Sequence, residues 1–179
     1  MPVITDSLTT LFDQQRACFR RGETRSAEAR RTQLHTLKRA VEAYEARLLD
    51  ALAQDLRKPP TESYLSEIGL VYEEIHLALK QVETWMQPQR VKTPLLQAPA
   101  SSFVQPEPYG TVGIIGPWNY PVQLLLIPLV GALAAGNTAL LKPSEYVPQT
   151  SATLAKMVKE FFEPQWVSLI EGAVEETQA

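Results

Sequence analysis

The sequence predicts an α/β protein in which N-terminal helices precede a βαβαβ unit with a parallel sheet. Up to Gln87, apolar residues recur every three or four positions, as they do in amphipathic helices. From Thr111 onward, short β-branched and apolar runs alternate with segments of helical length, as in strands joined by crossover helices. The 179 residues, of which 45% are hydrophobic, suffice for one domain of ordinary size or for part of a larger one.

Two helices are expected before Pro59. A short amphipathic helix ends at Gly22, because glycine is a common residue just past a helix end. The second helix runs from Ser26 to about Leu56 and is closed by Pro59 and Pro60, because proline lacks the backbone donor that a helix interior needs. Its apolar positions step by three or four: Leu34, Leu37, Val41, Tyr44, Leu48, Leu52 and Leu56.

A third helix is expected from about Ser63 to Gln87, where Pro88 ends it. The following segment as far as Pro108 contains further prolines, which deny a regular helix and indicate a linker. Within this linker, residues 103–105 are a candidate short strand, and residues 107–110 have the composition of a turn.

The α/β part begins with a β-branched run at Thr111–Ile115, which predicts a buried strand. After it we expect a helix over residues 122–135, a strand at 139–141, a helix over about 150–162 and a strand at 166–170. The first of these helices is too short for the ~20 residues that span a bilayer, so it is predicted to be buried. Because it is apolar nearly all round, we expect three strands with their helices to supply too little cover for it.

Asn119 and Lys142 each follow a predicted strand. Parallel strands joined by right-handed crossovers present their carboxyl ends on one rim of the sheet, where ligands of open α/β folds collect. We therefore expect both residues beside one crevice. Gly116 permits a tight exit from the strand, and Gly136 permits a left-handed helix end. The alternatives are that Asn119 is a turn or helix-cap residue and that the lysine and its nearby glutamate are ordinary surface charges.

The charge distribution excludes some kinds of partner. The net charge is −3, yet residues 1–60 carry 11 Lys and Arg against 8 acids, and residues 61–179 carry 6 against 12. The basic excess lies on helical patterns, and a nucleic-acid surface would need a denser, one-sided basic face. We therefore expect solvated helix surfaces and no nucleic-acid partner.

Cys18 is the single cysteine of the chain, which excludes an intrachain disulfide and a multi-cysteine zinc site. A lone cysteine fits a reducing compartment, and the absence of an apolar secretory start agrees, so a cytoplasmic location is expected. Arg16 and Arg20 would lower the pKa of this thiol, but it lies in the first helix, far from Asn119, and we expect it to be non-catalytic. Neither histidine has metal-ligand spacing around it, so no metal site is expected.

Two segments carry a resemblance to a known family: Gly116-Pro117-Trp118-Asn119-Tyr120-Pro121 and Lys142-Pro143-Ser144-Glu145. Together they resemble the NAD(P)-dependent aldehyde dehydrogenases, and residues 19–26 and 92–96 resemble the class 3 branch. The resemblance implies that residues 101–179 form the first part of a Rossmann-like cofactor-binding domain. It also implies that residues 1–100 form an N-terminal helical segment and linker, that the catalytic domain is absent, and that the fold is incomplete.

The resemblance assigns roles to particular residues. It places the carboxamide of Asn119 in an oxyanion hole. It also implies that Lys142 and Glu145 bind the hydroxyl groups of the adenosine ribose through hydrogen bonds. Glu145 would repel a 2′-phosphate, so NAD is the expected cofactor, with NADP tolerated. The other cofactor-binding positions that it implies are Ile115, Gly116, Pro117, Trp118 and Ser144. Tryptophan is more often a packing residue, so only the backbone of Trp118 is expected to meet the cofactor.

The implied reaction is oxidation of an aldehyde to a carboxylic acid. A cysteine thiolate attacks the aldehyde, Asn119 stabilises the oxyanion, hydride passes to NAD, and a glutamate base directs hydrolysis of the thioester. Neither the thiolate nor the base lies in this chain, so the chain alone is predicted to be inactive. The class 3 resemblance also implies that the complete enzyme is a homodimer.

The last residues of the sequence indicate whether the chain is part of a longer enzyme. Residues 171–177 resemble the family's loop before a further helix, which favours an incomplete chain. The alternative is a truncated pseudoenzyme that acts as a nucleotide-binding or assembly module.

Overall fold

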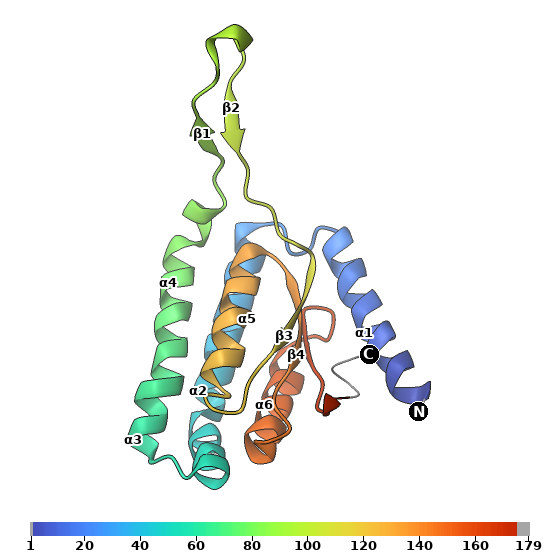
Figure 1. Cartoon of the computed structure of the whole chain (residues 1–179), viewed down its shortest axis with the longest axis vertical. Helices are drawn as coiled ribbons and strands as arrows, with labels where there is room; N and C mark the ends of the chain where they lie inside the picture. Colours follow the sequence, from blue (N-terminus) through green and yellow to red (C-terminus); the bar gives the residue numbers. More distant parts are fainter. Residues whose placement is uncertain (1, 175–179) are drawn as a thin grey trace.

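A computed structural model describes residues 2–174, with side chains described from residue 8 onward. N-terminal helices pack beside a parallel sheet whose strands alternate with helices, and a narrow hairpin projects from one end of the molecule (Figure 1). The predicted α/β class and the order βαβαβ are confirmed.

The first two helices follow the sequence signals closely. Helix α1 spans Pro2–Arg20, and Gly22 beyond its end has φ +77°. Helix α2 spans Ala27–Leu56, and the side chain of Ser26 caps it by accepting a hydrogen bond from a backbone N–H of the first turn. At its other end Arg57 takes the left-handed conformation, with φ 55°. The chain can therefore turn away at the two prolines that follow.

The third predicted helix is a run of three segments. Helix α3 (Pro60–Ser63) begins with proline at its first position, where the missing donor has no consequence. It continues as a π-helical turn, η1 (Tyr64–Ile68), and then as α4 (Gly69–Trp85). The N–H of Gly69 donates to the carbonyl of Tyr64, five residues earlier, and a Cβ at Gly69 would lie 3.0 Å from that oxygen. The absence of a side chain at Gly69 thus avoids a tight contact in the wide turn.

The predicted linker contains more structure than expected. Strand β1 (Gln89–Val91) pairs antiparallel with β2 (Ser102–Val104), and a short 3₁₀ turn, Leu95–Gln97, lies between them. The candidate strand in this segment is confirmed one residue earlier than predicted, whereas β1 was missed. Gln-Arg-Val has no apolar alternation, and its strand geometry depends on a partner more than ten residues away.

The sheet has the order β3-β4-β5, with all strands parallel. Its elements in chain order are β3 (Thr111–Ile115), α5 (Gln123–Ala135), β4 (Thr138–Lys142), α6 (Pro148–Phe161) and β5 (Val167–Leu169). The strand predicted as buried, β3, is only partly covered: among the described residues it is an edge strand, and its Gly113 and Ile115 are exposed. The central strand, β4, is instead the most buried.

The apolar helix α5 is covered on most of its circumference but not on all of it. Seven of its residues are buried: Leu125, Leu126, Leu129, Val130, Ala132, Leu133 and Ala134. Helices α2 and α4 pack against it in addition to the sheet, as Figure 1 shows. One face nevertheless stays exposed among the described residues, namely Leu124, Pro128, Gly131 and Ala135. The expected lack of cover therefore holds for this face, although the sequence analysis had not counted the N-terminal helices that cover the rest.

One hydrophobic core joins the two predicted segments, since its members come from α2, α4, α5, α6 and the sheet. The domain boundary at residue 100 stays a prediction. The predicted loop at 171–177 extends past the described residues, which end at 174. Within residues 2–174, none of the helices has both the length and the hydrophobicity to cross a bilayer.

Candidate functional site

Two loops meet at the carboxyl ends of neighbouring strands. Residues 116–122, here called the Asn119 loop, follow β3, and residues 143–147 follow β4. The N–H of Gly116 donates to the carbonyl of Lys142 at 2.9 Å, which joins the starts of the two loops. A Cβ at Gly116 would lie 3.0 Å from Cδ1 of Leu125, so the absence of a side chain there allows α5 to pack close to the strand end. The loop that carries Asn119 thus starts at a direct backbone bond to Lys142.

Asn119 is exposed in the middle of its loop. Its backbone carbonyl accepts a hydrogen bond from Nζ of Lys58 at 3.0 Å, whereas its carboxamide makes no hydrogen bond to any part of the chain that the structure describes. The residue that caps α5 is Val122, without a side-chain cap. The helix-cap interpretation of Asn119 is therefore wrong, and its carboxamide is available to a ligand.

Lys142 and Glu145 form an ion pair beside that loop. Nζ of Lys142 donates to Oε2 of Glu145 at 3.1 Å and to the carbonyl of Pro143 at 3.2 Å. The glutamate's own backbone N–H, together with this lysine, lowers the pKa of Glu145 below its usual value. Its carboxylate is thus an ionised hydrogen-bond acceptor near neutral pH, next to a mostly buried donor.

Ser144 holds the turn between these two residues. Its hydroxyl accepts a hydrogen bond from the N–H of Tyr146 at 3.3 Å, and the residue is buried. This arrangement gives the serine a structural task in shaping the loop, whatever else its backbone contacts.

Exposed apolar side chains surround the polar groups. Ile115 is 63% exposed and Trp118 is 54% exposed, and Tyr146 is exposed beside Glu145. Packing within the described residues therefore does not account for the Trp118 side chain, in contrast to the packing role expected for it. A few convergent polar groups among apolar side chains are typical of small-molecule sites.

The sequence analysis missed two residues that support the Asn119 loop. Lys58 lies between α2 and α3, and Glu67 lies in the π-helical turn. Oε1 of Glu67 accepts from Nζ of Lys58 at 2.6 Å, and Oε2 accepts from the N–H of Val122 at 2.9 Å. The side chain of Glu67 is 0% exposed. One signal was available: Glu67 precedes the buried Val71 by four residues, which places a charge in line with the apolar side of the predicted helix.

Cys18 lies apart from this site. It is buried in α1 and donates to Oε2 of Glu23 at 3.3 Å. Burial, followed by the hydrogen bond to Glu23, raises the pKa of the Cys18 thiol to about 12. The thiol is therefore protonated at neutral pH, which opposes a nucleophilic role and outweighs the nearby arginines. Both histidines, His35 and His76, are exposed on helices.

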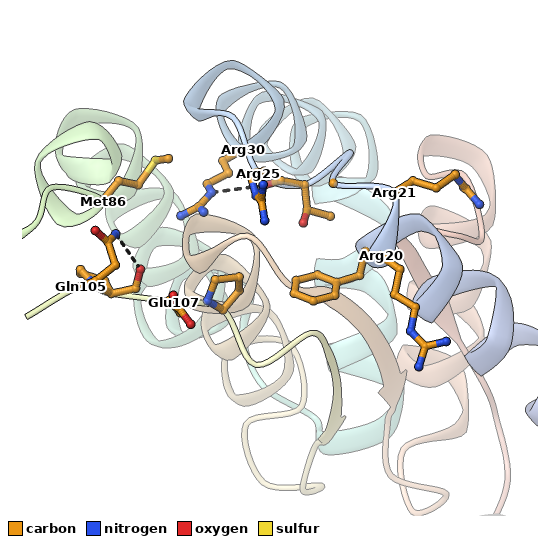
Figure 2. Close-up of a pocket in the computed structure, with 12 residues that line it drawn as sticks. Arg20, Arg21, Arg25, Arg30, Met86, Gln105 and Glu107 are labelled. Carbon is orange, nitrogen blue, oxygen red and sulfur yellow. Dashed lines mark hydrogen bonds between the residues drawn. The ribbon is translucent and has the colours of Figure 1, made fainter.

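A cavity of about 620 Å³ lies at the other end of the sheet, before β3 begins (Figure 2). Four arginines line it: Arg20, Arg21, Arg25 and Arg30. Arg30 is buried and donates to the carbonyls of Thr24 and Ala134, so it satisfies the end of α5. Arg21 pairs with Glu23 at 2.6 Å. The Arg30 contacts thus join α2 to the end of α5, whereas the Arg21 pair is local and exposed, and the cavity is separate from the predicted site.

Comparison with known proteins agrees with the resemblance. The sequence profile of the Aldehyde dehydrogenase family matches residues 6–179. The chain is 42% identical over 167 residues to 4,4'-diaponeurosporen-aldehyde dehydrogenase of Staphylococcus aureus, covering 93% of this chain and 36% of that protein. It is 45% identical over 163 residues to aldehyde dehydrogenase family 3 member B2 of mouse, covering 91% of this chain and 34% of that protein.

The structure agrees as well. A solved structure of the substrate-bound state of Staphylococcus aureus AldH superimposes with a TM-score of 0.93 at 41% identity, covering 96% of this chain and 37% of that one. The chain thus spans about a third of the length of these relatives, and the similarity to class 3 members is confirmed. By profile, sequence identity and fold together, this chain belongs to the aldehyde dehydrogenase family.

Proposed function

We propose that this chain contributes the oxyanion-stabilising residue and the adenosine-ribose subsite of an NAD(P)-dependent enzyme that oxidises aldehydes to carboxylic acids. One observation carries the proposal. The free carboxamide of Asn119 lies on the loop after β3, and that loop starts beside the end of β4, where Lys142 pairs with Glu145. Ligands of open α/β sheets bind at such strand ends.

Asn119 supplies a neutral hydrogen-bond donor. Its NH2 group stabilises an oxyanion without exchanging a proton with it, and one such donor contributes about 3 kcal/mol in comparable holes. The backbone of the residue is held by Lys58 at 3.0 Å, so little reorganisation is needed when charge develops. A held backbone reduces the ordering that the side-chain donor needs when it meets the oxyanion.

The residues at the end of β4 fit the ribose of a dinucleotide. The Glu145 carboxylate accepts from Lys142 with Oε2, and its exposed side chain can accept the ribose hydroxyls, to which Lys142 adds donors. Members of the family use NAD(P)⁺, and the nicotinamide supplies the hydride acceptor of the reaction. The negative charge of Glu145 favours NAD, and a 2′-phosphate would be admitted only if that side chain rotates away.

The nucleophile and the general base are proposed to come from the part of the relatives' length that this chain does not span. Cys18 is excluded by its burial and its raised pKa. Accordingly, the chain alone is expected to lack aldehyde oxidation, and a cytoplasmic location remains part of this proposal. The class of aldehyde is set by parts of the enzyme beyond these residues.

The homodimer implied by the resemblance is also part of the proposal. The β1–β2 hairpin supports it: Leu95 and Leu96 at its tip are 92% and 100% exposed, and Phe103 on β2 is exposed as well. Exposed apolar side chains grouped at the end of a narrow arm are typical of a surface that contacts another protein surface. Sedimentation of the full-length protein is expected to give a dimer. A monomer at micromolar concentration would contradict the proposed homodimer.

The test of the catalytic role uses the full-length protein that carries this segment. Asn119→Ala is expected to lower the single-turnover rate of acylation by about 10²- to 10³-fold, because the oxyanion loses a donor. The dissociation constant of NAD, measured by calorimetry, is expected to change less than about twofold, since no cofactor contact is assigned to this carboxamide.

Gln54→Ala is a matched control, because it removes a carboxamide from an exposed position on α2. Its acylation rate is expected to equal that of the parent. An unchanged acylation rate in Asn119→Ala would refute the assignment of Asn119 to the oxyanion hole.

A further inference from the structure

We propose that Lys58 and Glu67 are positioning residues for aldehyde oxidation: they fix the backbone of the Asn119 loop so that its free carboxamide meets the reacting carbonyl oxygen. This inference rests on the proposed oxyanion role of Asn119. Both residues lie in the N-terminal helical part of the chain, 61 and 52 positions before Asn119, and neither carries a side chain that the proposed chemistry uses.

Lys58 holds the middle of the loop. Its Nζ donates to the carbonyl oxygen of Asn119 at 3.0 Å and lies 4.0 Å from the centroid of the Tyr120 ring. The first contact fixes the peptide plane after Asn119, and the second is a cation–π contact with the next side chain. Together they fix the orientation of the Asn119 backbone, and so the direction in which its side chain leaves the chain.

Glu67 holds the end of the loop and connects it to Lys58. Its Oε2 accepts the N–H of Val122 at 2.9 Å, while its Oε1 accepts from Lys58 at 2.6 Å. The start of the loop is fixed by the bond between Gly116 and Lys142, at 2.9 Å. The backbone of the loop is therefore fixed at residues 116, 119 and 122. The side-chain carboxamide of Asn119 is free to meet a ligand.

The helix that carries Glu67 departs from α geometry at this place. Glu67 lies in the π-helical turn Tyr64–Ile68, and Gly69 closes that turn. A π turn changes the direction of the side chains around it, and such turns are frequent at functional sites. The fully buried carboxylate thus reaches the main chain of the loop from a helical turn in which Gly69 avoids a close contact with the Tyr64 carbonyl.

A purely stabilising role accounts less well for these contacts. Side chains of Lys58 and Glu67 are 12% and 0% exposed, and for a buried pair the loss of hydration offsets much of the attraction. Apolar residues of similar size often stabilise such a position equally well. Unlike an apolar pair, Lys58 and Glu67 make two hydrogen bonds to the loop backbone.

The experiment is a double-mutant cycle on the full-length enzyme, with single-turnover acylation as the readout. Lys58→Met keeps the aliphatic stem and removes the donors, and we expect a loss of about 10- to 100-fold, as for a small misplacement of a reacting group. In the Asn119→Ala background the same substitution is expected to cost less than about twofold, since the group being positioned is gone. Lys58→Arg is expected to restore most of the rate, because a guanidinium donates to both partners.

Two further variants complete the design. The neutral double variant Lys58→Met/Glu67→Gln avoids a lone buried charge, so it replaces the single variant if that one does not fold, and the same loss is expected of it. Lys38→Met is the matched control, because Lys38 pairs with Glu42 on the exposed face of α2 at 3.6 Å, and its rate is expected to equal that of the parent.

The outcomes separate this inference from the proposed function. A rate loss at Lys58 that is as large with Asn119→Ala as without it would show that the pair acts on stability or elsewhere, and would overturn the positioning role alone. A parental rate in Lys58→Met would do the same. If Asn119→Ala itself left the rate unchanged, the oxyanion role and the positioning role would fall together.

Discussion

The two asparagines of the chain lie at opposite ends of the sheet and differ in how their carboxamides are used. Asn137, before β4, is buried: its Oδ1 accepts the N–H of Gly110 at 2.9 Å, and its Nδ2 donates to the carbonyl of Ala132 at 3.2 Å. Asn119, after β3, is exposed, and among the described residues its carboxamide has no partner. The same functional group closes the fold at one end and is free at the other.

The difference shows how the two edges of the sheet divide their tasks. At the amino edge, side chains satisfy the backbone, as Arg30 does for the end of α5. At the carboxyl edge, side chains from elsewhere hold the backbone of the Asn119 loop and leave its own polar group available. Buried polar groups that are fully paired stabilise a unique structure, whereas an exposed and unpaired one on a fixed backbone is suited to a ligand.

The largest effect is expected from Asn137→Ala. The substitution leaves the buried N–H of Gly110 without an acceptor, which costs about 2 to 4 kcal/mol when both lost hydrogen bonds are counted. Thermal unfolding of the full-length protein is expected to show a clearly lower midpoint, while the acylation rate per folded molecule stays within about twofold. A parental midpoint would mean that the amino edge does not depend on this carboxamide.

Gly136→Ala is expected to destabilise the same edge by about 2 kcal/mol. Gly136 has φ +87°, and a Cβ there would lie 2.7 Å from the guanidinium carbon of Arg30. Gly131→Ala is the matched control, because Gly131 is a helical position where an added Cβ meets nothing within 4 Å. The control is expected to stabilise α5 by about 0.5 to 1 kcal/mol. Equal effects of the two substitutions, measured by chemical denaturation, would contradict the assignment of strain to Gly136.

A smaller effect, on the carboxyl edge, is expected from Glu145→Gln. Loss of the charged acceptor is expected to weaken NAD binding by about 10-fold, because hydrogen bonds to charged groups contribute roughly 1.5 to 3 kcal/mol. It is also expected to shift the preference toward NADP, since the repulsion of a 2′-phosphate disappears. Calorimetric titration with both cofactors measures the ratio, with Glu163→Gln as an exposed control. A constant ratio of NAD to NADP affinity would argue against the ribose role.

The smallest effect concerns Cys18. Its pKa is raised to about 12 from 9.0, so between these values the folded protein retains a proton that the unfolded chain releases. The resulting contribution to stability is complete below pH 9 and is lost as the pH rises toward 12. At pH 8 we expect Cys18 to react with iodoacetamide much more slowly in the folded protein than after denaturation, as followed by mass spectrometry of the Cys18 peptide. Equal rates in both states would show that the thiol is neither buried nor protonated as described.

The sequence predicted the elements that depend on local signals. The second helix begins and ends within one residue of its predicted bounds, the strand 111–115 was assigned with its observed ends, and Gly136 has the predicted left-handed conformation. These features depend on side chains within a few positions of the element itself. Hydrophobic periodicity and capping residues therefore sufficed to find them.

Features that depend on distant contacts were missed. The π-helical turn at Tyr64–Ile68 has no characteristic composition, and strand β1 depends on its pairing with β2. The contact between Lys58 and the carbonyl of Asn119 joins residues 61 positions apart, so no local pattern indicates it. For the site, the sequence indicated that the Asn119 loop and Lys142 lie at neighbouring strand ends, as the bond between Gly116 and Lys142 shows, but it did not reveal what holds the Asn119 loop in place.

The most direct test of this account measures Asn119→Ala and Asn137→Ala side by side in the full-length protein, recording for each the acylation rate per folded molecule and the unfolding midpoint. The account predicts opposite patterns: Asn119→Ala loses rate by about 10²-fold or more and keeps its midpoint, whereas Asn137→Ala loses its midpoint and keeps its rate. If both variants lost stability alike and the acylation rate did not depend on Asn119, the division between the two edges of the sheet would be contradicted.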